Sequence, residues 1–200
     1  MKVSIFGGTN PATNPKWLAF TKPLGELLCK NDFEVVWGGN AFGVLTSIIS
    51  SISEDKPTTL VIPDVYEEDL KKMPQYEISG KGKTVNKLVK TKSISNRTHE
   101  MLKMAEAVVV VPGGIGTIYE FWTAIEGRRA EEYNVEIIML NYKGFFNKQL
   151  EFFDFINKNG FTKIGVGGAP YKIAPEKLFK VVKTPEQVIE VLKQIQQKKA

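Results

Sequence analysis

Residues 107–120 read Ala-Val-Val-Val-Val-Pro-Gly-Gly-Ile-Gly-Thr-Ile-Tyr-Glu, an apolar run that ends in a glycine-rich turn. Consecutive valines are typical of a central parallel strand that is covered on both faces. Gly113, Gly114 and Gly116 allow a sharp turn and a close approach of the backbone to a ligand. A helix expected to begin near Thr117 would point its unpaired N–H groups at an anion. The segment therefore predicts an α/β sheet that holds a phosphate.

Glu120 lies in the first turn of the same predicted helix, and two interpretations are open. A carboxylate at that position interacts favourably with the helix macrodipole and needs no further role. Alternatively, the carboxylate projects into a ligand cleft as an acid, a base or a stabiliser of charge. This segment alone does not separate the two.

The composition favours one soluble unit. The chain has 200 residues, of which 42% are hydrophobic, enough for one well-cored domain and too few for two. Residues 1–200 are therefore expected to form a single domain. The one cysteine, Cys29, excludes an internal disulfide, and the start at Met1 leads directly into strand-like residues without a signal-peptide pattern. With no apolar run as long as a membrane span, we expect a cytoplasmic protein without a membrane partner.

The charge balance suits a small anionic ligand. The chain has 27 basic and 22 acidic residues and a formal net charge of +5, which is modest for a nucleic-acid-binding protein. No ladder of alternating aromatic and basic residues is visible, so a nucleic-acid partner is not expected. One dense cluster of lysines extends from Lys81 to Lys92, and it is a candidate for binding an anion.

Strand-like and helix-like segments alternate along the chain. Besides the valine run, strands are expected at residues 2–6, 34–37, 58–62, 136–140 and 178–182. Helices are expected at residues 15–30, 43–53, 85–105 with a break near Thr91, 117–131, 147–159 and from 185 onward. Residues 63–82 have no clear period and predict a long functional loop. The alternation predicts an α/β fold, a Rossmann-like, doubly wound parallel sheet flanked by helices, with right-handed crossovers.

Three of the predicted strands end in glycine pairs, namely Gly7-Gly8, Gly38-Gly39 and Gly113-Gly114. In open α/β sheets, ligands bind beyond the carboxyl ends of the strands. We therefore expect the three turns to meet at one cleft.

Several familiar kinds of site are disfavoured. The turn after the valines lacks the Gly-Lys-Ser/Thr ending of a P-loop, so hydrolysis of ATP or GTP is not expected. It also lacks the third glycine of Gly-x-Gly-x-x-Gly, so NAD binding is not expected. One histidine and one cysteine do not provide a zinc site, and we expect no metal. The histidine, His99, is interpreted as a surface or hydrogen-bonded residue.

Two motifs together carry a family resemblance. The segment Ile94-Ser-Asn-Arg97-Thr-His-Glu-Met101, an apolar strand and then Pro112-Gly-Gly-Ile-Gly-Thr-Ile-Tyr-Glu120 resemble the LONELY GUY (LOG) phosphoribohydrolases, relatives of proteins often labelled lysine decarboxylases. The family signatures are Met-x-x-Arg-Lys-x-x-Met, which is degenerate here, and Pro-Gly-Gly-x-Gly-Thr-x-x-Glu, which is intact. The resemblance extends over nearly the whole chain, including residues 6–9, 38–43 and 82–85.

The resemblance implies hydrolysis of the N-glycosidic bond of a nucleoside 5′-monophosphate, in that family commonly a cytokinin riboside monophosphate. Arg97 and Glu120 would be the catalytic residues, because a carboxylate can stabilise oxocarbenium charge or activate water. The phosphate would be held by Gly113, Gly114, Ile115, Gly116 and Thr117. Further nucleotide contacts are expected from Gly8, Thr9, Gly39, Asn40, Thr98 and Lys83. The resemblance implies no metal or redox cofactor, and it implies a homodimer or a higher homo-oligomer.

Departures from the family pattern surround the expected site. Thr98 replaces the lysine that follows the arginine, Lys83 replaces a glutamate, and Thr123 replaces an acid three residues after Glu120. Either the chain hydrolyses a different phosphorylated nucleoside, or it is a non-catalytic nucleotide-binding or sensing protein that keeps the family pocket. The intact Arg97 and Glu120 favour the enzyme.

Overall fold

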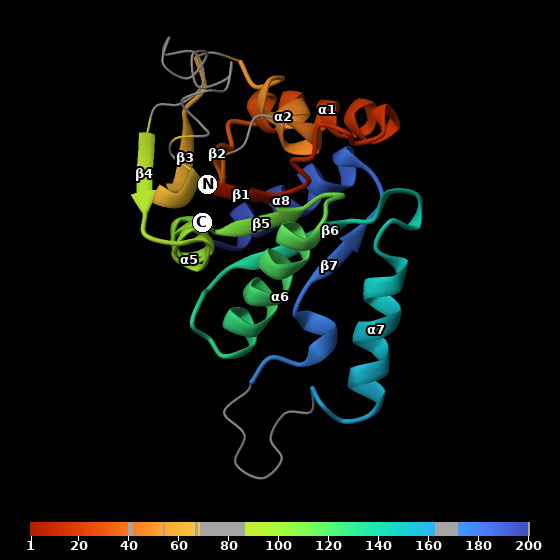
Figure 1. Cartoon of the computed structure of the whole chain (residues 1–200). Helices are drawn as coiled ribbons and strands as arrows, with labels where there is room; N and C mark the ends of the chain where they lie inside the picture. The colour runs from red at the N-terminus through yellow and green to blue at the C-terminus, as the bar shows by residue number, and fades with distance from the viewer. Residues whose placement is uncertain (40–41, 54, 67, 69–86, 163–171, 200) are drawn as a thin grey trace.

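The fold is built on one parallel sheet. The computed structural model describes residues 1–39, 42–53, 55–66, 68, 87–162 and 172–199. Its seven strands have the order β4-β3-β2-β1-β5-β6-β7, and every neighbouring pair is parallel (Figure 1). The strands are β1 (Lys2–Phe6), β2 (Glu34–Trp37), β3 (Thr58–Pro63), β4 (Lys87–Thr91), β5 (Ala107–Val110), β6 (Glu136–Leu140) and β7 (Lys180–Val182).

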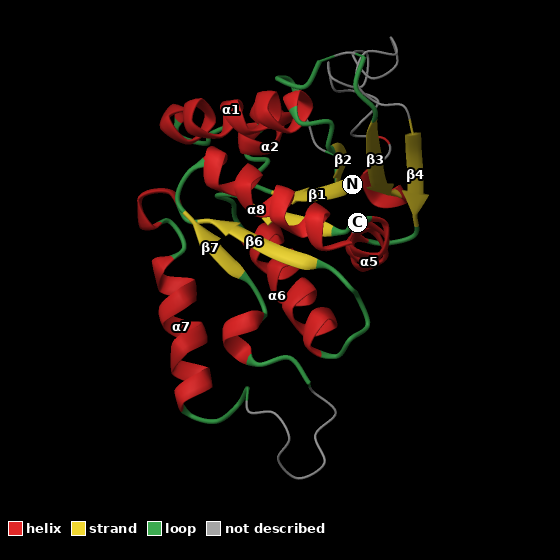
Figure 2. Ribbon diagram, turned by 180° about the vertical axis from the view of Figure 1, so that it is seen from behind, coloured by secondary structure: helices red, strands yellow, loops and turns green. Residues whose placement is uncertain are grey.

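Helices cover both faces of the sheet. The described helices are α1 (Pro15–Lys30), α2 (Gly43–Ile49), α5 (Ile94–Met104), α6 (Ile115–Arg129), α7 (Asn147–Lys158) and α8 (Pro185–Lys199), with short 3-10 turns η1 (Asp64–Tyr66), η2 (Tyr142–Gly144) and η3 (Pro175–Lys177). Helix α6 lies in front of the sheet in Figure 1, whereas α8 lies in front when the molecule is seen from behind in Figure 2. Among the described helices, none combines the length and the apolar character needed to cross a membrane.

The strand pattern divides the core into two layers. In β1, Val3 and Ile5 pack with α1, α2 and α8, whereas Phe6 packs with α5, α6 and α7. The valines of β5 are divided in the same way and are fully buried, as expected for a central strand covered on both faces. The predicted Rossmann-like, doubly wound sheet flanked by helices is confirmed.

The strand order reverses between β1 and β5. From β1 the chain winds outward through β2, β3 and β4, and then it returns to place β5 on the other side of β1. Such a switch point opens a crevice, because the connections after the two strands leave the sheet in opposite directions. The loops that follow β1 and β5 carry the first and third glycine pairs of the sequence.

The helix predicted for residues 85–105 is wrong in its first part. Residues Lys87–Thr91 form strand β4, paired in parallel with β3, and the helix α5 begins only at Ile94. Val89 packs against the core and the Thr91 hydroxyl donates to the Ile62 carbonyl at 3.2 Å. An edge strand is half-exposed and tolerates lysines that discourage edge pairing, so its apolar pattern is too weak to be distinguished from a helix.

The other boundaries differ by a few residues. Helix α2 ends at Ile49, before the predicted Ser53, and α6 begins at Ile115, before the predicted Thr117. The last strand begins at Lys180 because η3 precedes it. Of the predicted loop 63–82, Pro63 completes β3 and residues 64–66 form η1, while the remainder lies almost wholly outside the described residues.

The backbones of helices α1 and α2 approach each other closely at Gly25. Gly25 is buried, and a Cβ atom placed on it would overlap the Ile48 carbonyl oxygen and the Ser51 hydroxyl. The Ser51 hydroxyl donates to the Ile48 carbonyl at 2.7 Å and to the Lys22 carbonyl at 2.8 Å, which fixes the contact. Close packing there holds α1, whose first turn leads into the cleft described below.

We expect Gly25→Ala to lower the free energy of unfolding by about 1–3 kcal/mol, the usual cost of overpacking, although alanine is the better helix former. Gly116→Ala, also in a helix but with no atom within 4 Å of the added Cβ, is the matched control and should leave stability unchanged or raise it by up to about 1 kcal/mol. Urea denaturation measures both. Equal effects of the two substitutions would contradict the packing argument.

Candidate functional site

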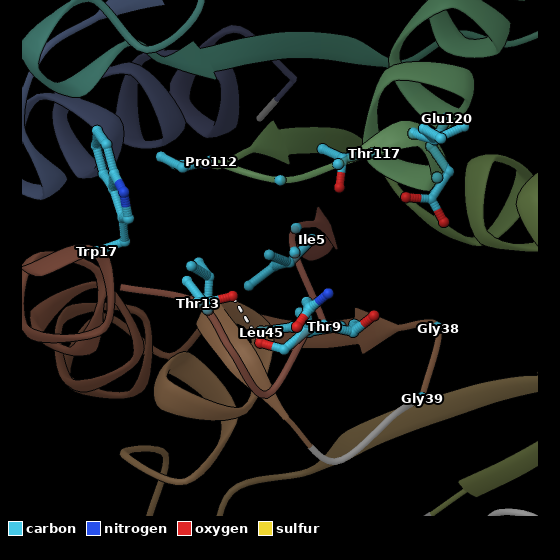
Figure 3. Close-up of a pocket in the computed structure, with 18 of the residues that line it drawn as sticks. Ile5, Thr9, Thr13, Trp17, Gly38, Gly39, Leu45, Pro112, Thr117 and Glu120 are labelled. Carbon is cyan, nitrogen blue, oxygen red and sulfur yellow. Dashed lines mark hydrogen bonds between the residues drawn. The ribbon is translucent and has the colours of Figure 1, made fainter. Parts of the chain in front are cut away.

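A cleft of about 530 Å³ lies beyond the carboxyl ends of four neighbouring strands, β2, β1, β5 and β6. Figure 3 shows Trp17 at one end of this cleft and Glu120 at the other, with Pro112 and Thr117 between them. The lining residues come from the three glycine turns, the starts of α1 and α2, the helix α5, the first two turns of α6, and the segments after β3 and β6. The predicted meeting of the glycine turns is therefore confirmed.

The glycine turns after β1 and β5 touch through their backbones. The Gly8 N–H donates to the Pro112 carbonyl at 3.0 Å, and the Leu45 N–H donates to the Gly8 carbonyl at 3.0 Å. A Cβ on Gly113 would lie 2.7 Å from the Gly8 nitrogen and would overlap the Thr117 hydroxyl. Gly8 and Gly113 are thus required by the close approach of two backbones, which also brings α6 over the switch point.

Helix α6 begins at the cleft without a capping side chain. Its N-cap residue, Gly114, has no side chain to accept a hydrogen bond, so the first N–H groups of the helix are not capped. Cβ positions on Gly114 and Gly116 meet no atom within 4 Å, so both face open space. Thr117 is 3% exposed and its hydroxyl lines the cleft. The arrangement suits an anion, because the positive end of the helix dipole faces the cleft.

An ion pair between Arg97 and Glu120 joins α5 to α6 beside these turns. Arg97 Nη2 donates to Glu120 Oε1 at 2.8 Å, and Nη1 donates to the Gly38 carbonyl at 3.2 Å. The two side chains are only 12% and 8% exposed. A Cβ on Gly38 would lie 3.3 Å from Arg97 Cζ, so only glycine leaves full room for the guanidinium. Arg97 has further N–H donors beyond the two used here.

Burial dominates the electrostatics of Glu120. Desolvation raises its pKa from 4.5 to about 7, although the charge of Arg97 and its hydrogen bond act in the opposite direction. A carboxyl group that titrates near neutrality is suited to exchange protons with a reacting group. Of the two interpretations of Glu120, projection into the cleft is the one that its position among the lining residues supports.

The cleft brings together most of the residues expected from the sequence. Arg97 and Glu120 line it, together with Gly8, Thr9, Gly39, Gly113, Gly114, Ile115, Gly116 and Thr117. Thr98 does not line it, because its side chain points into the protein, is fully buried and donates to the Ile94 carbonyl at 3.2 Å. Asn40 and Lys83 lie outside the described residues.

Several other polar residues do not line the cleft. His99 is hydrogen-bonded to the Tyr133 hydroxyl, which confirms its interpretation as a hydrogen-bonded residue. Thr123 donates to the Tyr119 carbonyl of its own helix at 2.9 Å. Arg128 and Arg129 lie at the far end of α6, where they pair with Glu136 and Glu126, respectively. These two arginines support the fold at that position.

Several lining residues were not expected as site residues. Gly38 belongs to the predicted glycine pair Gly38-Gly39, but only Gly39 was expected to contact the ligand. The Gly38 carbonyl accepts a hydrogen bond from Arg97. Tyr66 comes from η1, at the start of the predicted functional loop. Trp17 and Phe145 form the far end of the cleft, and no motif marks them. Their only sequence signal is that they follow the carboxyl ends of β1 and β6.

Among the described residues, no three His, Cys, Asp or Glu side chains gather closely enough to hold a metal ion. Among the described residues, the charged side chains that line the cleft are those of Arg97 and Glu120. What the cleft offers is therefore backbone N–H groups, one guanidinium and one carboxyl group that titrates near neutrality.

Comparison of the sequence with known families gives one matching model. Residues 35–192 match the family described as possible lysine decarboxylase. The chain is 28% identical over 160 residues to the probable cytokinin riboside 5′-monophosphate phosphoribohydrolase LOG4 of Oryza sativa subsp. japonica, covering 80% of this chain and 66% of the rice protein. It is 26% identical to the cytokinin riboside 5′-monophosphate phosphoribohydrolase LOG7 of Arabidopsis thaliana, covering 80% and 70%. The match spans about two thirds of the length of these relatives.

Solved structures share the fold over nearly the whole chain. The Moco carrier protein of Chlamydomonas reinhardtii superposes with a TM-score of 0.65 at 17% identity, covering 98% of both chains. The molybdenum cofactor binding protein of Rippkaea orientalis superposes with a TM-score of 0.60 at 15% identity, covering 97% of this chain and 96% of the other. At these identities the likeness concerns the fold.

We expect Glu120 to make stability depend on pH. Its pKa is raised on folding, so its contribution is fully present below pH 4.5 and is lost as the pH rises through about 7. Relative to Glu120→Gln, the wild type should lose about 3 kcal/mol of unfolding free energy between pH 4 and pH 8. Urea denaturation of both proteins across this range measures the difference.

Glu126→Gln is the matched control, because Glu126 lies on the same helix with a side chain that is 57% exposed. Its stability should follow that of the wild type at every pH. A wild type that gains stability over Glu120→Gln with rising pH would mean that the ion pair outweighs desolvation.

Proposed function

The chain belongs to the family described as possible lysine decarboxylase, and from this premise we propose that it hydrolyses the N-glycosidic bond of a nucleoside 5′-monophosphate. Water adds across the bond between C1′ and the base nitrogen. The hydroxyl group joins C1′, the base nitrogen receives the bonding electrons and a proton, and the products are the free base and ribose 5-phosphate. The observation that carries the proposal is the buried Arg97–Glu120 pair beside an uncapped, glycine-lined helix start.

The phosphate would lie at the start of α6. The N–H groups that follow Gly113 and Gly114 have no capping side chain, and the Thr117 hydroxyl lines the same space. An anion there is stabilised by the helix dipole and by backbone donors. The role of Gly8 is to let the two turns approach closely enough to form the floor of this site.

Glu120 would act on the sugar. Breaking the bond at C1′ develops oxocarbenium character, which a carboxylate can stabilise while it accepts a proton from the attacking water. A pKa of about 7 leaves a useful fraction ionised near neutrality and makes the carboxylate a better base than an ordinary glutamate. Arg97 positions the carboxylate through its 2.8 Å hydrogen bond, and its remaining donors can support the departing base.

A second candidate function is binding of a nucleotide without hydrolysis. Thr98 and Thr123 are uncharged, so neither supplies the charged group that the resembled enzymes have at these positions. The hydroxyl of each donates to a backbone carbonyl of its own helix. The cleft would still hold a phosphate. The experiments below separate the two functions by measuring binding and base release independently.

We expect Glu120→Gln to lower kcat/KM for base release by about 100-fold or more, the contribution typical of a general acid or base. The Kd for the same nucleotide should change little, because the phosphate contacts remain. Chromatography of released base from adenosine, guanosine, cytidine and uridine 5′-monophosphates, with calorimetric titration, tests both values. Glu126→Gln is the control. A wild type that binds a nucleotide tightly and releases no base from any of them contradicts the enzyme and favours the binding protein.

The pH profile should report Glu120 directly. Because the ionised carboxylate is the active form, kcat/KM should rise about tenfold per pH unit below pH 7 and level off above it. In Arg97→Gln the inflection should move to higher pH, since the arginine charge and hydrogen bond lower the pKa of Glu120. Arg129→Gln, which removes the partner of Glu126, should leave the inflection unchanged. A profile that falls with rising pH through 7 would assign Glu120 the role of an acid.

A further inference from the structure

The cleft continues past the proposed phosphate site to an aromatic end. This end is formed by Trp17, from the first turn of α1, and by Phe145, from the segment after β6. The two rings contact each other edge to face, with their centroids 5.1 Å apart. Tyr142 packs edge to face against Trp17, with the two ring centroids 5.7 Å apart. Phe145 remains 38% exposed although it is a large apolar residue lining the cleft.

The functional groups follow one another along the edge of the sheet. Gly38, which binds Arg97, follows β2; the glycine turns follow β1 and β5; and Phe145 follows β6. These four strands are direct neighbours, so the cleft extends over three interstrand spacings, or about 14 Å. Figure 3 gives the same order, with Pro112 and Thr117 between Glu120 and Trp17.

This order leaves the aromatic end unused by a simple nucleoside monophosphate. The base is attached to C1′, which must lie at Glu120, and the phosphate lies at the start of α6. The base therefore lies on the Glu120 side of the phosphate, away from Trp17 and Phe145. Whatever covers these rings must be attached to the ligand through its phosphate.

The surroundings of the aromatic end suit a planar group on an anionic link. Aromatic side chains stack on rings with little dependence on their identity. Lys16 Nζ lies 4.9 Å from the Trp17 ring centre and Lys143 Nζ lies 5.4 Å from the Tyr142 ring centre, so positive charge borders these rings. Ile115, the first residue of α6, also lines the cleft and is 92% exposed, which adds an apolar surface for a ligand to cover.

We propose that the ligand is a nucleotide whose 5′-phosphate carries a second group with a planar ring, as in a dinucleotide, and that this ring stacks on Phe145 and meets Trp17 edge to face. The inference rests on the proposed function, because it takes the phosphate site and the position of C1′ from it. In hydrolysis, the bond between C1′ and the base would break as before. The ring would leave with the ribose, still joined to it through the phosphate.

The test compares two phosphate esters that differ only in the ring. Titration calorimetry measures the Kd of the 5′-methylphosphate and 5′-phenylphosphate esters of adenosine, guanosine, cytidine and uridine, with the four monophosphates as references. Both esters carry the same charge, so their ratio isolates the ring. The phenyl ester should bind at least about fivefold more tightly, the lower range for stacking of one ring.

Phe145→Ala and Phe145→Leu should reduce that ratio to below about twofold, because both remove the aromatic ring. The leucine variant keeps apolar volume in case the alanine variant is unstable. Phe152→Ala is the matched control, since Phe152 is 53% exposed and lies on α7 outside the cleft lining. It should leave the ratio unchanged.

The outcomes separate the two proposals. Monophosphates that bind and are hydrolysed, with a phenyl-to-methyl ratio near one or a ratio that Phe145→Leu does not change, overturn the aromatic subsite and leave the proposed function intact. A protein that binds neither the monophosphates nor the esters contradicts both. Tighter binding of the phenyl esters that depends on Phe145, without base release, supports the subsite on a binding protein.

Discussion

The contact between the backbones of Gly8 and Pro112-Gly113 is the constraint on which the rest of the site depends. It joins the turns after β1 and β5 at the point where the strand order reverses. Because a Cβ on Gly113 would lie 2.7 Å from the Gly8 nitrogen, any other residue would push the turns apart. The same contact fixes where α6 begins, and the rise of that helix then determines where Thr117 and Glu120 stand. One packing requirement thereby positions both the uncapped start of α6 and the carboxyl group of Glu120.

Burial of the Arg97–Glu120 pair lowers the stability of the folded protein at neutral pH, but it makes Glu120 a stronger base. Arg97 lowers the pKa of Glu120, yet desolvation outweighs it and leaves the group titrating near 7. A fully solvated carboxylate would stabilise the folded protein more at neutral pH, but it would be a weaker base. Gly38 takes part in this balance, because its carbonyl and its missing side chain hold the guanidinium where it can reach Glu120. Functional sites commonly retain destabilising features of this kind.

The sequence was most informative where local pattern and tertiary position agree. The valine run, the glycine pairs and the intact Pro-Gly-Gly-x-Gly-Thr-x-x-Glu segment identified the central strand, the cleft and Glu120, because each requires a backbone geometry that few residues provide. Strand β4 was assigned to a helix because edge strands lack a strong apolar alternation. Thr98 was expected to bind the nucleotide from the motif alone, but the rotation of α5 directs it into the core. Trp17 and Phe145 could not be found from sequence, since their proximity depends on the packing of α1 against the segment after β6.

The separation of the aromatic end from Glu120 would let ligand choice change without disturbing the proposed reaction centre. Glu120 and Arg97 are held by α5, α6 and the turn after β2, whereas Trp17 and Phe145 come from α1 and the segment after β6. The two ends of the cleft are thus built by different elements. The proposed anion site at the start of α6 lies between them and consists of backbone N–H groups together with the Thr117 hydroxyl. Such an arrangement would let the fold keep one phosphate site while the group on either side of the phosphate varies.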